Sequence, residues 1–554
     1  MSEVMRDPNR VDIYDTTLRD GLQTVGVSMD IAGRVEVAKQ LDRIGVDVIE
    51  AGLPGSGPAT GEHELEAVQA VAMAVDSVKV AALCRVVPGD IENGWAAVEP
   101  ARERGGARLH LFVSTSDIQM KEQQKTPDIV MDLTKSEVAR AKSLCDDVEF
   151  SPMDATRSDP EFMMRVCQIA VAEGATVINI PDTTGDMTHR QFGGLIEVVR
   201  QEIHAYNPEV VISAHTHGDR GLSAAANIEA VAAGARQIEV SVNGIGPRLG
   251  NAGLADIVGN IREGGDPLPP NVYTNVDARQ LRETSQLVAM VSGKAAPDNL
   301  AFTSSTAFAH VEGIHQHDVV GNPRSFESLD AAAYGQEPGQ IVLGPLSGRV
   351  GVGLRLKNIG IELDKDDLNT VTARVKELAV QQGRNLADND IERLAAAITG
   401  EDIADYWHLD LVEAGESDGV ATAKVMVTAL DHRGKAEKTY KKKVHLPGKG
   451  AIDAMITAIN ETTGFDGILD NWGGGSKEPG SDAVGGIEVK VKAPSGHSVT
   501  VHAEGNSVLQ ATANAYMMGR NMIPRVQRRD PNYHQHTLSE GGLLYGGSHS
   551  RPLG

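Results

Sequence analysis

The sequence has few cysteines, no long apolar run and no excess of basic residues. Its three cysteines, Cys84, Cys145 and Cys167, lie far apart and match neither a disulfide framework nor a zinc-binding spacing, so we expect a reducing compartment. No apolar run approaches the ~18 residues that a membrane span requires, and the N-terminal residues do not resemble a signal peptide. We therefore expect a cytoplasmic protein that does not associate with membranes.

Acidic side chains outnumber basic ones. The chain has 76 Asp and Glu against 52 Lys and Arg, which gives a formal net charge of −24 at pH 7. This balance argues against a nucleic-acid-binding surface. The 554 residues exceed the ~250 to 300 at which a single core stops growing, so there is room for a large catalytic domain and at least one more.

One pattern occurs eight times in the first 265 residues: a short β-branched run, a polar or glycine-bearing turn, and an amphipathic helical stretch such as Ile31–Ile44 or Phe162–Ala172. The predicted strands are Val11–Asp15, Val46–Gly52, Val78–Cys84, Arg108–Ser114, Val148–Ser151, Thr176–Asp182, Val210–His215 and Gln237–Asn243. Eight β/α units in about 260 residues indicate a TIM barrel, with a doubly wound sheet as the competing architecture.

Two segments point to a metal site. Arg19 and Asp20 follow the first predicted strand, and His215-Thr-His217 ends the seventh. Because residues i and i+2 of a strand point the same way, the two histidines can bind one ion, to which Asp20 can add a carboxylate. Such nitrogen and oxygen ligands suit a divalent cation that acts as a Lewis acid on a carbonyl. The alternative is a pair of histidines at an exposed strand end.

Reactive residue types follow the carboxyl ends of the predicted strands, where the active sites of TIM barrels lie. They are Arg19, Asp20, Glu50, Arg85, Thr115, Ser116, Asp154, Asp182, Thr183, His215, His217 and Asn251. An open sheet would leave the first and seventh strands apart, whereas a closed barrel brings them together. The metal site therefore favours the barrel.

Several motifs carry a specific resemblance. They are Asp15-Thr-Thr-Leu-Arg-Asp-Gly21, Ala214-His-Thr-His217, Asn243-Gly-Ile-Gly-Pro-Arg-Leu-Gly-Asn251, Phe308-Ala-His-Val-Glu-Gly-Ile-His315 and Leu346-Ser-Gly-Arg349. Together they resemble the acyl-CoA Claisen-condensing metalloenzymes, which include 2-isopropylmalate, citramalate and homocitrate synthases. The likeness extends to about residue 525. The segments Thr115–Asp117 and Pro181–Thr183 and the C-terminal region are most similar to 2-isopropylmalate synthases.

The resemblance implies a reaction and roles for residues. The family condenses acetyl-CoA with a 2-oxo acid, here with 2-oxoisovalerate favoured, to give a 2-alkylmalate and CoA in leucine biosynthesis. The implied ligands of a divalent metal (Mg, Mn or Zn) are Asp20, His215, His217 and Asn251. Arg19 is implied to stabilise the developing alkoxide. Thr183 and Gln23, with Arg19, are implied to bind the substrate, and His315 to act as the base, tuned or replaced by Glu312 or His317.

Pattern and resemblance together predict four regions: a TIM-barrel catalytic domain at 1–284, a helical connector at 285–402, a regulatory amino-acid-binding domain at 403–525 and a disordered tail at 526–554. The connector includes the amphipathic stretches Asp366–Gln382 and Asp388–Ile398. In the family such helical subdomains carry the residue equivalent to His315 over the partner chain's barrel. This implies a homodimer or a higher homo-oligomer.

Beyond Trp407 the pattern changes to alternating strands. Two β-rich units that each end in a helix resemble a leucine-sensing regulatory domain, so we expect an amino-acid effector, with leucine favoured. The predicted elements are strands Trp407–Val412, Val420–Leu430, Lys438–Leu446, Gly486–Ala493 and Ser498–Glu504, helices Ala451–Asn460 and Val508–Met518, and a glycine-rich loop at Asn471–Asp482.

The turns that open the two helices are Gly448–Ala454, with Gly450 and Asp453, and Gly505–Ser507. Their free amide groups suit an amino acid's carboxylate. The alternative is that these residues only cap the helices.

Several positions depart from the family's usual motifs. Met153 stands where a glutamate is usual, which removes a carboxylate from the substrate pocket. The other departures are Gly218 for asparagine, Gln119 for histidine, His317 for aspartate, and Pro345 and Val350 for histidines. The expected metal ligands are unchanged. We therefore expect the metal-dependent chemistry to persist, while the identity of the 2-oxo acid stays open.

Two alternatives remain beside 2-isopropylmalate synthesis. One is a citramalate synthase or a specialised alkylmalate synthase that uses pyruvate or another 2-oxo acid. The other is a catalytically weakened paralogue that binds an amino acid and works as a regulatory subunit, for which Met153 is the main argument.

Overall fold

The structure is a computed structural model that describes residues 7–55, 61–87, 89–417, 420–447, 450–476 and 485–531. The chain divides into two compact units, one of Met1–Ala307 with Asp330–Gln336 and one of Phe308–Leu329 with Glu337–Gly554. Three parts of the sequence-based expectations lie outside the described residues: Gly448 and Lys449, positions 477–484 and positions 532–554.

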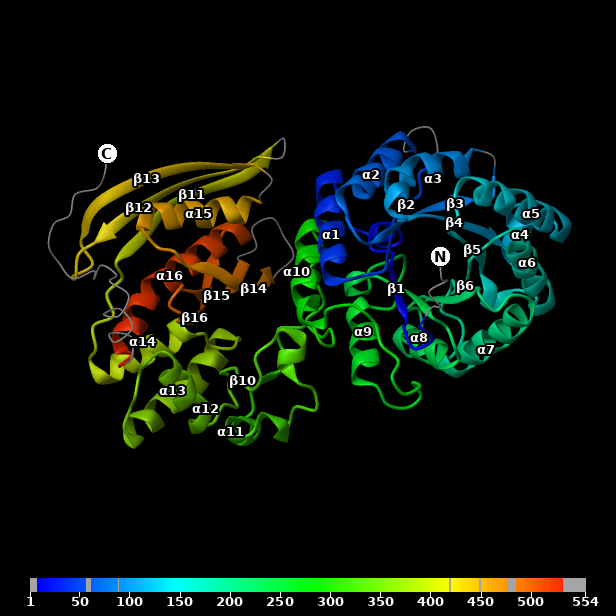
Figure 1. Cartoon of the computed structure of the whole chain (residues 1–554). Coiled ribbons are helices and arrows are strands. Elements are labelled where there is room, and N and C mark those ends of the chain that lie inside the picture. Colours follow the sequence, from blue (N-terminus) through cyan, green and yellow to red (C-terminus); the bar gives the residue numbers. More distant parts are fainter. Residues whose placement is uncertain are drawn as a thin grey trace. The chain divides into compact units, whose positions relative to one another are not determined.

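Eight parallel strands close into a barrel in the first unit (Figure 1), which confirms the predicted TIM barrel over the doubly wound sheet. β1 pairs with both β2 and β8, and this closes the barrel. Every residue of β2 and β6 is buried, as expected for parallel strands covered by helices. The strands are β1 Asp12–Asp15, β2 Val48–Gly52, β3 Lys79–Arg85, β4 Ala107–Ser114, β5 Val148–Met153, β6 Val177–Asp182, β7 Val211–Thr216 and β8 Gln237–Val240.

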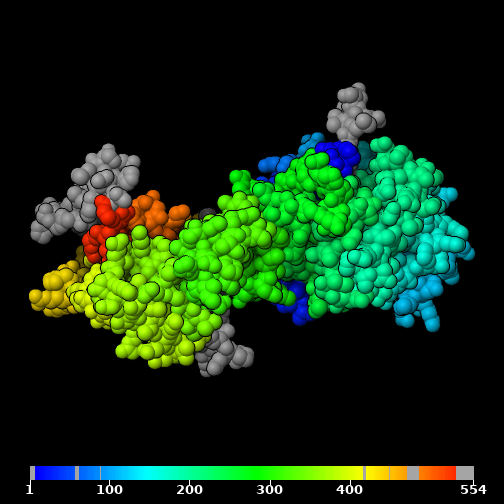
Figure 2. All heavy atoms as spheres, turned by 90° about the horizontal axis from the view of Figure 1, so that it is seen from below, coloured from blue at the N-terminus to red at the C-terminus, as the bar shows by residue number. Residues whose placement is uncertain are grey.

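Amphipathic helices surround the strands, and those after β4 to β7 form the cyan to green surface of this unit (Figure 2). α1 shows how the sequence sets their ends: Asp30 caps it by accepting the N–H of Gly33 at 2.7 Å, and Gly45 ends it at φ 88°. The helices are α1 Ile31–Ile44, α2 Gly61–Ala74, α3 Asp90–Val98, α4 Asp117–Glu122, α5 Pro127–Leu144, α6 Pro160–Ala172, α7 His189–Tyr206, α8 Ser223–Ala232 and α9 Leu254–Glu263.

The first unit continues past the expected boundary at residue 284. α10 (Leu281–Ser292) spans that boundary and buries Leu281 and Val288. Gln40 of α1 donates from Nε2 to Oγ1 of Thr284 at 3.1 Å, which ties α10 to the barrel helices.

The second unit begins with short elements. β9 (Ala309–His310) pairs with β10 (Gln340–Ile341), and four helices belong to the same region. They are α11 Gly313–Gly321, α12 Arg349–Asn358, α13 Lys365–Gln382 and α14 Asp388–Thr399. The last two match the two amphipathic stretches that the sequence predicts.

Two three-stranded antiparallel sheets follow, each succeeded by a helix (Figure 1). The elements are β11 Trp407–Ser417, β12 Val420–Leu430, β13 Ala436–Pro447 and α15 Ala451–Thr463, then β14 Ile468–Ser476, β15 Gly485–Lys492, β16 Ser498–Gly505 and α16 Val508–Arg529.

Two details of the sequence-based assignment are wrong here. The expected loop at Asn471–Asp482 is a strand as far as Ser476, because Gly475 pairs with Gly486 of β15. Glycine weakens a strand, but ladder pairing with a neighbouring strand outweighs this local tendency. The first residues of the expected tail are helical, since α16 continues to Arg529.

Among the described residues of the second unit, one apolar core runs from the helices to the sheets. It joins α12, α13 and α14 to both sheets and to α15 and α16, with members such as Leu356, Val375, Val427, Val501 and Met522. The expected connector and the expected regulatory region thus share one interior.

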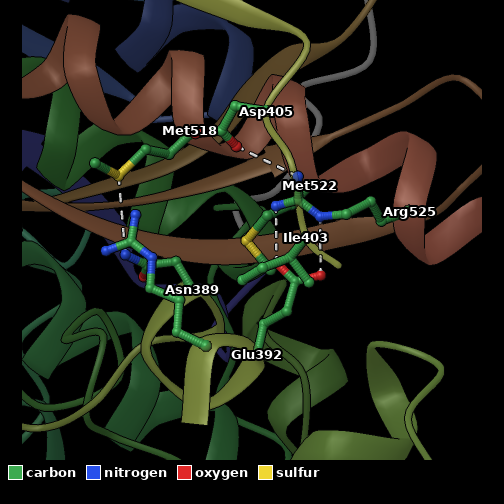
Figure 3. A pocket seen from close by; sticks show the side chains of 8 residues that line it. Asn389, Glu392, Ile403, Asp405, Met518, Met522 and Arg525 are labelled. Carbon is green, nitrogen blue, oxygen red and sulfur yellow. Dashed lines mark hydrogen bonds and ion pairs between the residues drawn. The ribbon is translucent and has the colours of Figure 1, made fainter. Parts of the chain in front are cut away.

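Polar side chains hold α14 against the second sheet and α16. Nε and Nη2 of Arg525 donate to the two carboxylate oxygens of Glu392 at 3.0 and 2.8 Å. The amide of Asn389 both donates to and accepts from the backbone of His502, each at 3.1 Å. Asn389, Glu392 and Arg525, with Met518 and Met522, line a cavity of about 40 Å³ (Figure 3). We call the contact formed by Asn389, Glu392, Met518, Met522 and Arg525 the α14–α16 joint.

Among the helices of the described ranges, none combines the length and the apolar character needed to cross a membrane. Cys84, Cys145 and Cys167 are buried and carry no disulfide.

Candidate metal centre and substrate site

Asp20, His215 and His217 meet at the carboxyl end of the barrel. Their ligand atoms lie within 4.8 Å of one another, and all three residues are buried. Nε2 of His215 is 3.1 Å from Nε2 of His217, which is 3.8 Å from Oδ2 of Asp20. Only 6% of each histidine is exposed, so the alternative of an exposed histidine pair is excluded.

Loop contacts bring the parts of this cluster together. Asp20 follows β1, His215 is in β7, and His217 follows β7. The backbone of His217 forms an isolated bridge with Asn251, which lies beyond β8. Nδ2 of Asn251 donates to Oδ2 of Asp20 at 2.9 Å. Closure of the barrel thus brings together residues that are more than two hundred positions apart in the sequence.

Each imidazole is held from its Nδ1 side. Oε2 of Glu239 lies 2.7 Å from Nδ1 of His215, and the carbonyl of Gly250 lies 3.2 Å from Nδ1 of His217. Carbonyl and carboxylate oxygens only accept hydrogen bonds, so these contacts favour a proton on Nδ1. The Nε2 lone pairs then face the cluster, which is the arrangement of metal-binding histidines.

The donor set fits a divalent cation. Two Nε2 atoms and a carboxylate converge at close range, and Oδ1 of Asn251 is buried with no hydrogen-bond partner in the part of the chain that the structure describes. A buried polar atom without a partner is costly, and a cation offers it one. Nitrogen and oxygen donors together suit Mg, Mn or Zn.

Burial and neighbouring charges separate the pKa values of these groups. Burial lowers the pKa of His217, and the charge of His215 lowers it further, to about 3. At His215 the effect of burial is outweighed by Glu239, which raises the pKa. At Asp20 burial is likewise outweighed, first by Arg19 and then by the histidines, so that its pKa is lowered. A carboxylate and a neutral His217 are therefore available to a cation at neutral pH.

Arg19 is a fixed positive charge beside the cluster. Its Nη1 contacts Oδ1 of Asp20, and its Nε donates to Oε2 of Glu50. Its side chain is 12% exposed and that of Glu50 is fully buried. Burial alone would raise the pKa of Glu50, but Arg19 and His110 hold that pKa well below its usual range.

The barrel interior continues as a polar chain that sequence reasoning largely missed. Nδ1 of His110 lies 2.8 Å from Oε1 of Glu50, and its Nε2 lies 2.7 Å from Oγ of Ser151, which also accepts from Asn179 at 2.9 Å. Glu239 was missed as well. The available signal was a polar residue inside a short apolar strand, as in Leu109-His110-Leu111 or Ile238-Glu239-Val240.

Thr183 and Asp154 adjoin each other at the ends of β6 and β5. The N–H of Asp154 donates to Oγ1 of Thr183 at 3.0 Å, so the hydroxyl proton of Thr183 stays available for an acceptor. Arg157 binds both carboxylate oxygens of Asp154 at 2.8 Å. Gln23 is exposed at the end of the short 3₁₀ helix Gly21–Gln23.

His315 and Glu312 belong to the second unit. Nε2 of His315 is 3.7 Å from Oε2 of Glu312, with side chains 42% and 50% exposed. The imidazole packs on Phe326 at a ring separation of 4.1 Å. His317 is 71% exposed and contacts its neighbour Asp318. An exposed imidazole beside a carboxylate is accessible for proton transfer.

The predicted effector residues open two helices. Oγ of Ser507 accepts the N–H of Gln510 at 3.1 Å and so caps α16. Gly450 is the N-cap of α15, and Asp453 is exposed in its first turn. Capping is therefore the observed role of Ser507, and an amino-acid site at these turns stays a prediction.

Known families match the chain over most of its length. Residues 10–288 match the HMGL-like family, residues 302–383 the homocitrate synthase post-HMGL domain-like family, and residues 385–524 the LeuA allosteric (dimerisation) domain. Among solved structures, an HMG-CoA lyase of Bacillus subtilis is 23% identical, covers 53% of this chain and 98% of its own, and has a TM-score of 0.43.

Curated relatives match over nearly the whole length. The 2-isopropylmalate synthase of Acidimicrobium ferrooxidans is 38% identical over 94% of this chain and 98% of that protein. The 2-isopropylmalate synthases of Synechococcus sp. and Gloeobacter violaceus are 37% and 38% identical over 96% and 93% of this chain and 98% and 95% of their own.

The closed barrel and the match over residues 10–288 define the catalytic region as HMGL-like. Within that class the chain belongs to the 2-isopropylmalate synthase family, since its relatives of that name match it over more than nine tenths of its length. The resemblance seen in the sequence motifs is thereby confirmed.

Proposed function

We propose that this chain is a metal-dependent acyltransferase that condenses acetyl-CoA with 2-oxoisovalerate to give 2-isopropylmalate and CoA in leucine biosynthesis. A carbon–carbon bond forms between the acetyl methyl and the ketone carbon, and water then cleaves the thioester to release CoA. The buried cluster of Asp20, His215 and His217 beside Arg19 is the observation that carries this proposal. The full-length relatives support the substrate pair.

The divalent metal would be held by Asp20, His215 and His217, whose ligand atoms converge, and by Asn251, whose Oδ1 is buried beside them without a hydrogen-bond partner among the described residues. When bound, it supplies a Lewis acid for the oxygen of the ketone. Arg19 is already fixed by Asp20 and Glu50, so its charge can stabilise the negative oxygen that develops during carbon–carbon bond formation without first reorganising.

Substrate binding is assigned to Thr183, Gln23 and Arg19. The hydroxyl of Thr183 can donate to the carboxylate of the 2-oxo acid, because its oxygen already accepts from Asp154. His315 is the proposed base that removes a proton from the acetyl methyl, and Glu312 can stabilise the imidazolium that results. His315 lies on α11, which belongs to the second unit and not to the barrel unit. We propose that the protein is a homodimer or a higher homo-oligomer in which α11 places His315 over the barrel of a partner chain.

Residues 403–525 are the proposed regulatory region, and leucine the proposed effector. The match of residues 385–524 to the LeuA allosteric (dimerisation) domain supports this assignment. Gly450, Asp453 and Ser507 remain the candidate contacts for the effector's carboxylate and ammonium groups.

The test is a panel of 2-oxo acids incubated with acetyl-CoA and the purified protein, with free thiol as the readout and mass spectrometry of the products. Thiol release with 2-oxoisovalerate and formation of 2-isopropylmalate are the expected result. Turnover with pyruvate instead would assign a citramalate synthase. No turnover with any member of the panel, combined with leucine binding, would assign a regulatory paralogue.

A further inference from the structure

We infer that Glu239 is a positioning residue of the metal centre, which orients His215 and makes it the stronger of the two histidine ligands. This inference rests on the proposed metal site. Glu239 itself is assigned no contact with substrate.

Strand register places Glu239 beside His215. Ser213 and Ala214 of β7 pair with Gln237 and Ile238 of β8, so the next positions along the two strands are His215 and Glu239. Nε2 of Gln237 donates to Oγ of Ser213 at 3.0 Å, which shows that this alternating set faces the barrel interior. The 2.7 Å contact between Oε2 of Glu239 and Nδ1 of His215 follows from that register.

The two histidines are supported differently. His215 faces a carboxylate through Nδ1, whereas His217 faces the backbone carbonyl of Gly250 at the longer distance of 3.2 Å. A carboxylate draws more on the Nδ1 proton than a neutral carbonyl does and so leaves more electron density on Nε2. The contact of Nδ1 of His215 with Glu239 is an ion pair and not a hydrogen bond, but the charge of Glu239 makes His215 the better donor of the pair.

The burial of Glu239 needs an explanation. The residue is 1% exposed, and a carboxylate buried without a charged or hydrogen-bonding partner is costly. Among the described residues Oε1 has no hydrogen-bond partner, and Oε2 has an ion-pair contact with Nδ1 of His215. Support of a metal ligand accounts for a carboxylate at this place, where an apolar side chain would otherwise pack better.

A second ion is the competing explanation, because ligand atoms of His110, Glu149 and Glu239 also lie within 4.8 Å of one another. Glu149 is already engaged, since Arg108 donates to its Oε2 at 2.9 Å and Gln237 to its Oε1 at 2.7 Å. His110 is engaged by Glu50 and Ser151. We therefore assign Glu239 to His215 and not to a second cation.

The experiment compares Glu239→Ala, Glu239→Gln and the control Glu149→Gln in the full-length protein. Gln keeps an acceptor for the Nδ1 proton but removes the charge, whereas Ala removes both. The readouts are the dissociation constant of Co²⁺ by chelator competition, its visible absorption spectrum, and circular dichroism as a check of folding.

We expect Glu239→Ala to weaken Co²⁺ binding by about 10- to 100-fold with an altered spectrum, and Glu239→Gln to weaken it by less. The control should stay within about twofold of the unmodified protein. Unchanged affinity and spectrum in both Glu239 variants would overturn the inference. So would binding of two Co²⁺ ions by the unmodified protein with loss of one in Glu239→Ala. An unmodified protein that binds no Co²⁺ would instead overturn the proposed metal site itself.

Discussion

At the scale of single residues, the candidate site depends on charges that the barrel holds before any substrate arrives. Arg19 is fixed between Asp20 and Glu50, and His215 and His217 are fixed through their Nδ1 atoms. Because these groups are buried, they interact with substrate through a medium of low dielectric. Preorganisation of this kind is what lets a few side chains stabilise a developing negative charge.

Replacement of one ligand tests the metal centre. We expect His217→Ala to abolish turnover and to lower the bound metal measured by elemental analysis, because one of the converging nitrogen donors is lost. Helical circular dichroism should be unchanged, since His217 lies after β7 and outside the apolar core. Full activity of this variant after chelator treatment would contradict the assignment of the ligands.

Met153 tests substrate selection. Ser151 and Met153 alternate on β5 and therefore share the inward face, where Ser151 contacts His110. If a carboxylate at this position completes the pocket for 2-oxoisovalerate, Met153→Glu should raise turnover by about 10-fold, the effect of one charge-assisted contact.

The matched control is Met153→Gln, which has the same size as the glutamate variant but no charge, and turnover should stay near that of the unmodified protein. A fall in turnover with 2-oxoisovalerate in Met153→Glu would mean that the pocket is built around an apolar residue for a different 2-oxo acid.

At the scale of elements, the α14–α16 joint is a buried polar contact of the second unit. Glu392 is 1% exposed and accepts from Arg525 and Arg529, which belong to α16. A buried ion pair adds little net stability, but removal of one partner leaves a buried charge without compensation. The joint thus makes the docking of α14 sensitive to single substitutions.

We expect Glu392→Ala to lower the free energy of unfolding of the second unit by about 3 kcal/mol, because two arginines lose their buried partner. Glu401→Ala is the control, since its side chain is 43% exposed and also contacts Arg529. It should cost less than about 1 kcal/mol. Denaturant titration followed by tryptophan fluorescence, to which Trp407 contributes, compares the two, and equal shifts in both variants would contradict the importance of the joint.

At the scale of the whole molecule, the helices and both sheets of the second unit share one core. Removal of the sheets to test regulation would therefore also disturb the helices. The core joins α12–α14 to both sheets, so a chain that ends near Gly400 keeps only about a third of its buried members. We expect such a truncation to expose apolar surface around α13 and α14 and to lose solubility or helicity, seen by light scattering and circular dichroism. A monodisperse, fully helical truncated chain would contradict this expectation.

Regulation is therefore better tested in the intact protein. We expect calorimetry to detect binding of leucine, and assays to show inhibition by it, because an effector that binds two states unequally shifts their balance. Asp453→Ala should weaken binding by about 10-fold if its carboxylate contacts the effector's ammonium group. Binding of none of the twenty amino acids would mean that residues 403–525 are structural.

The sequence alone determined the barrel and the composition of its metal cluster. Strand alternation and the eight-fold repeat are local properties, and the expected meeting of Asp20 with His215 and His217 then favoured a closed barrel over a doubly wound sheet. Local periodicity also located α13, α14 and the strands β11, β12, β13, β15 and β16, but not β14. These features depend on which side chains lie on one face of an element, which the sequence encodes directly.

Other features were decided only by tertiary structure. β14 forms because β15 pairs with its glycines, although those glycines favour a loop when read locally. The register between strands places Glu239 beside His215 and His110 beside Glu50. The alternation of residues along each strand limits the possible registers but does not select one of them. The union of the helical segment with both sheets in one core has the same cause: contacts between residues distant in sequence depend on how complete elements pack, and no local pattern contains that information.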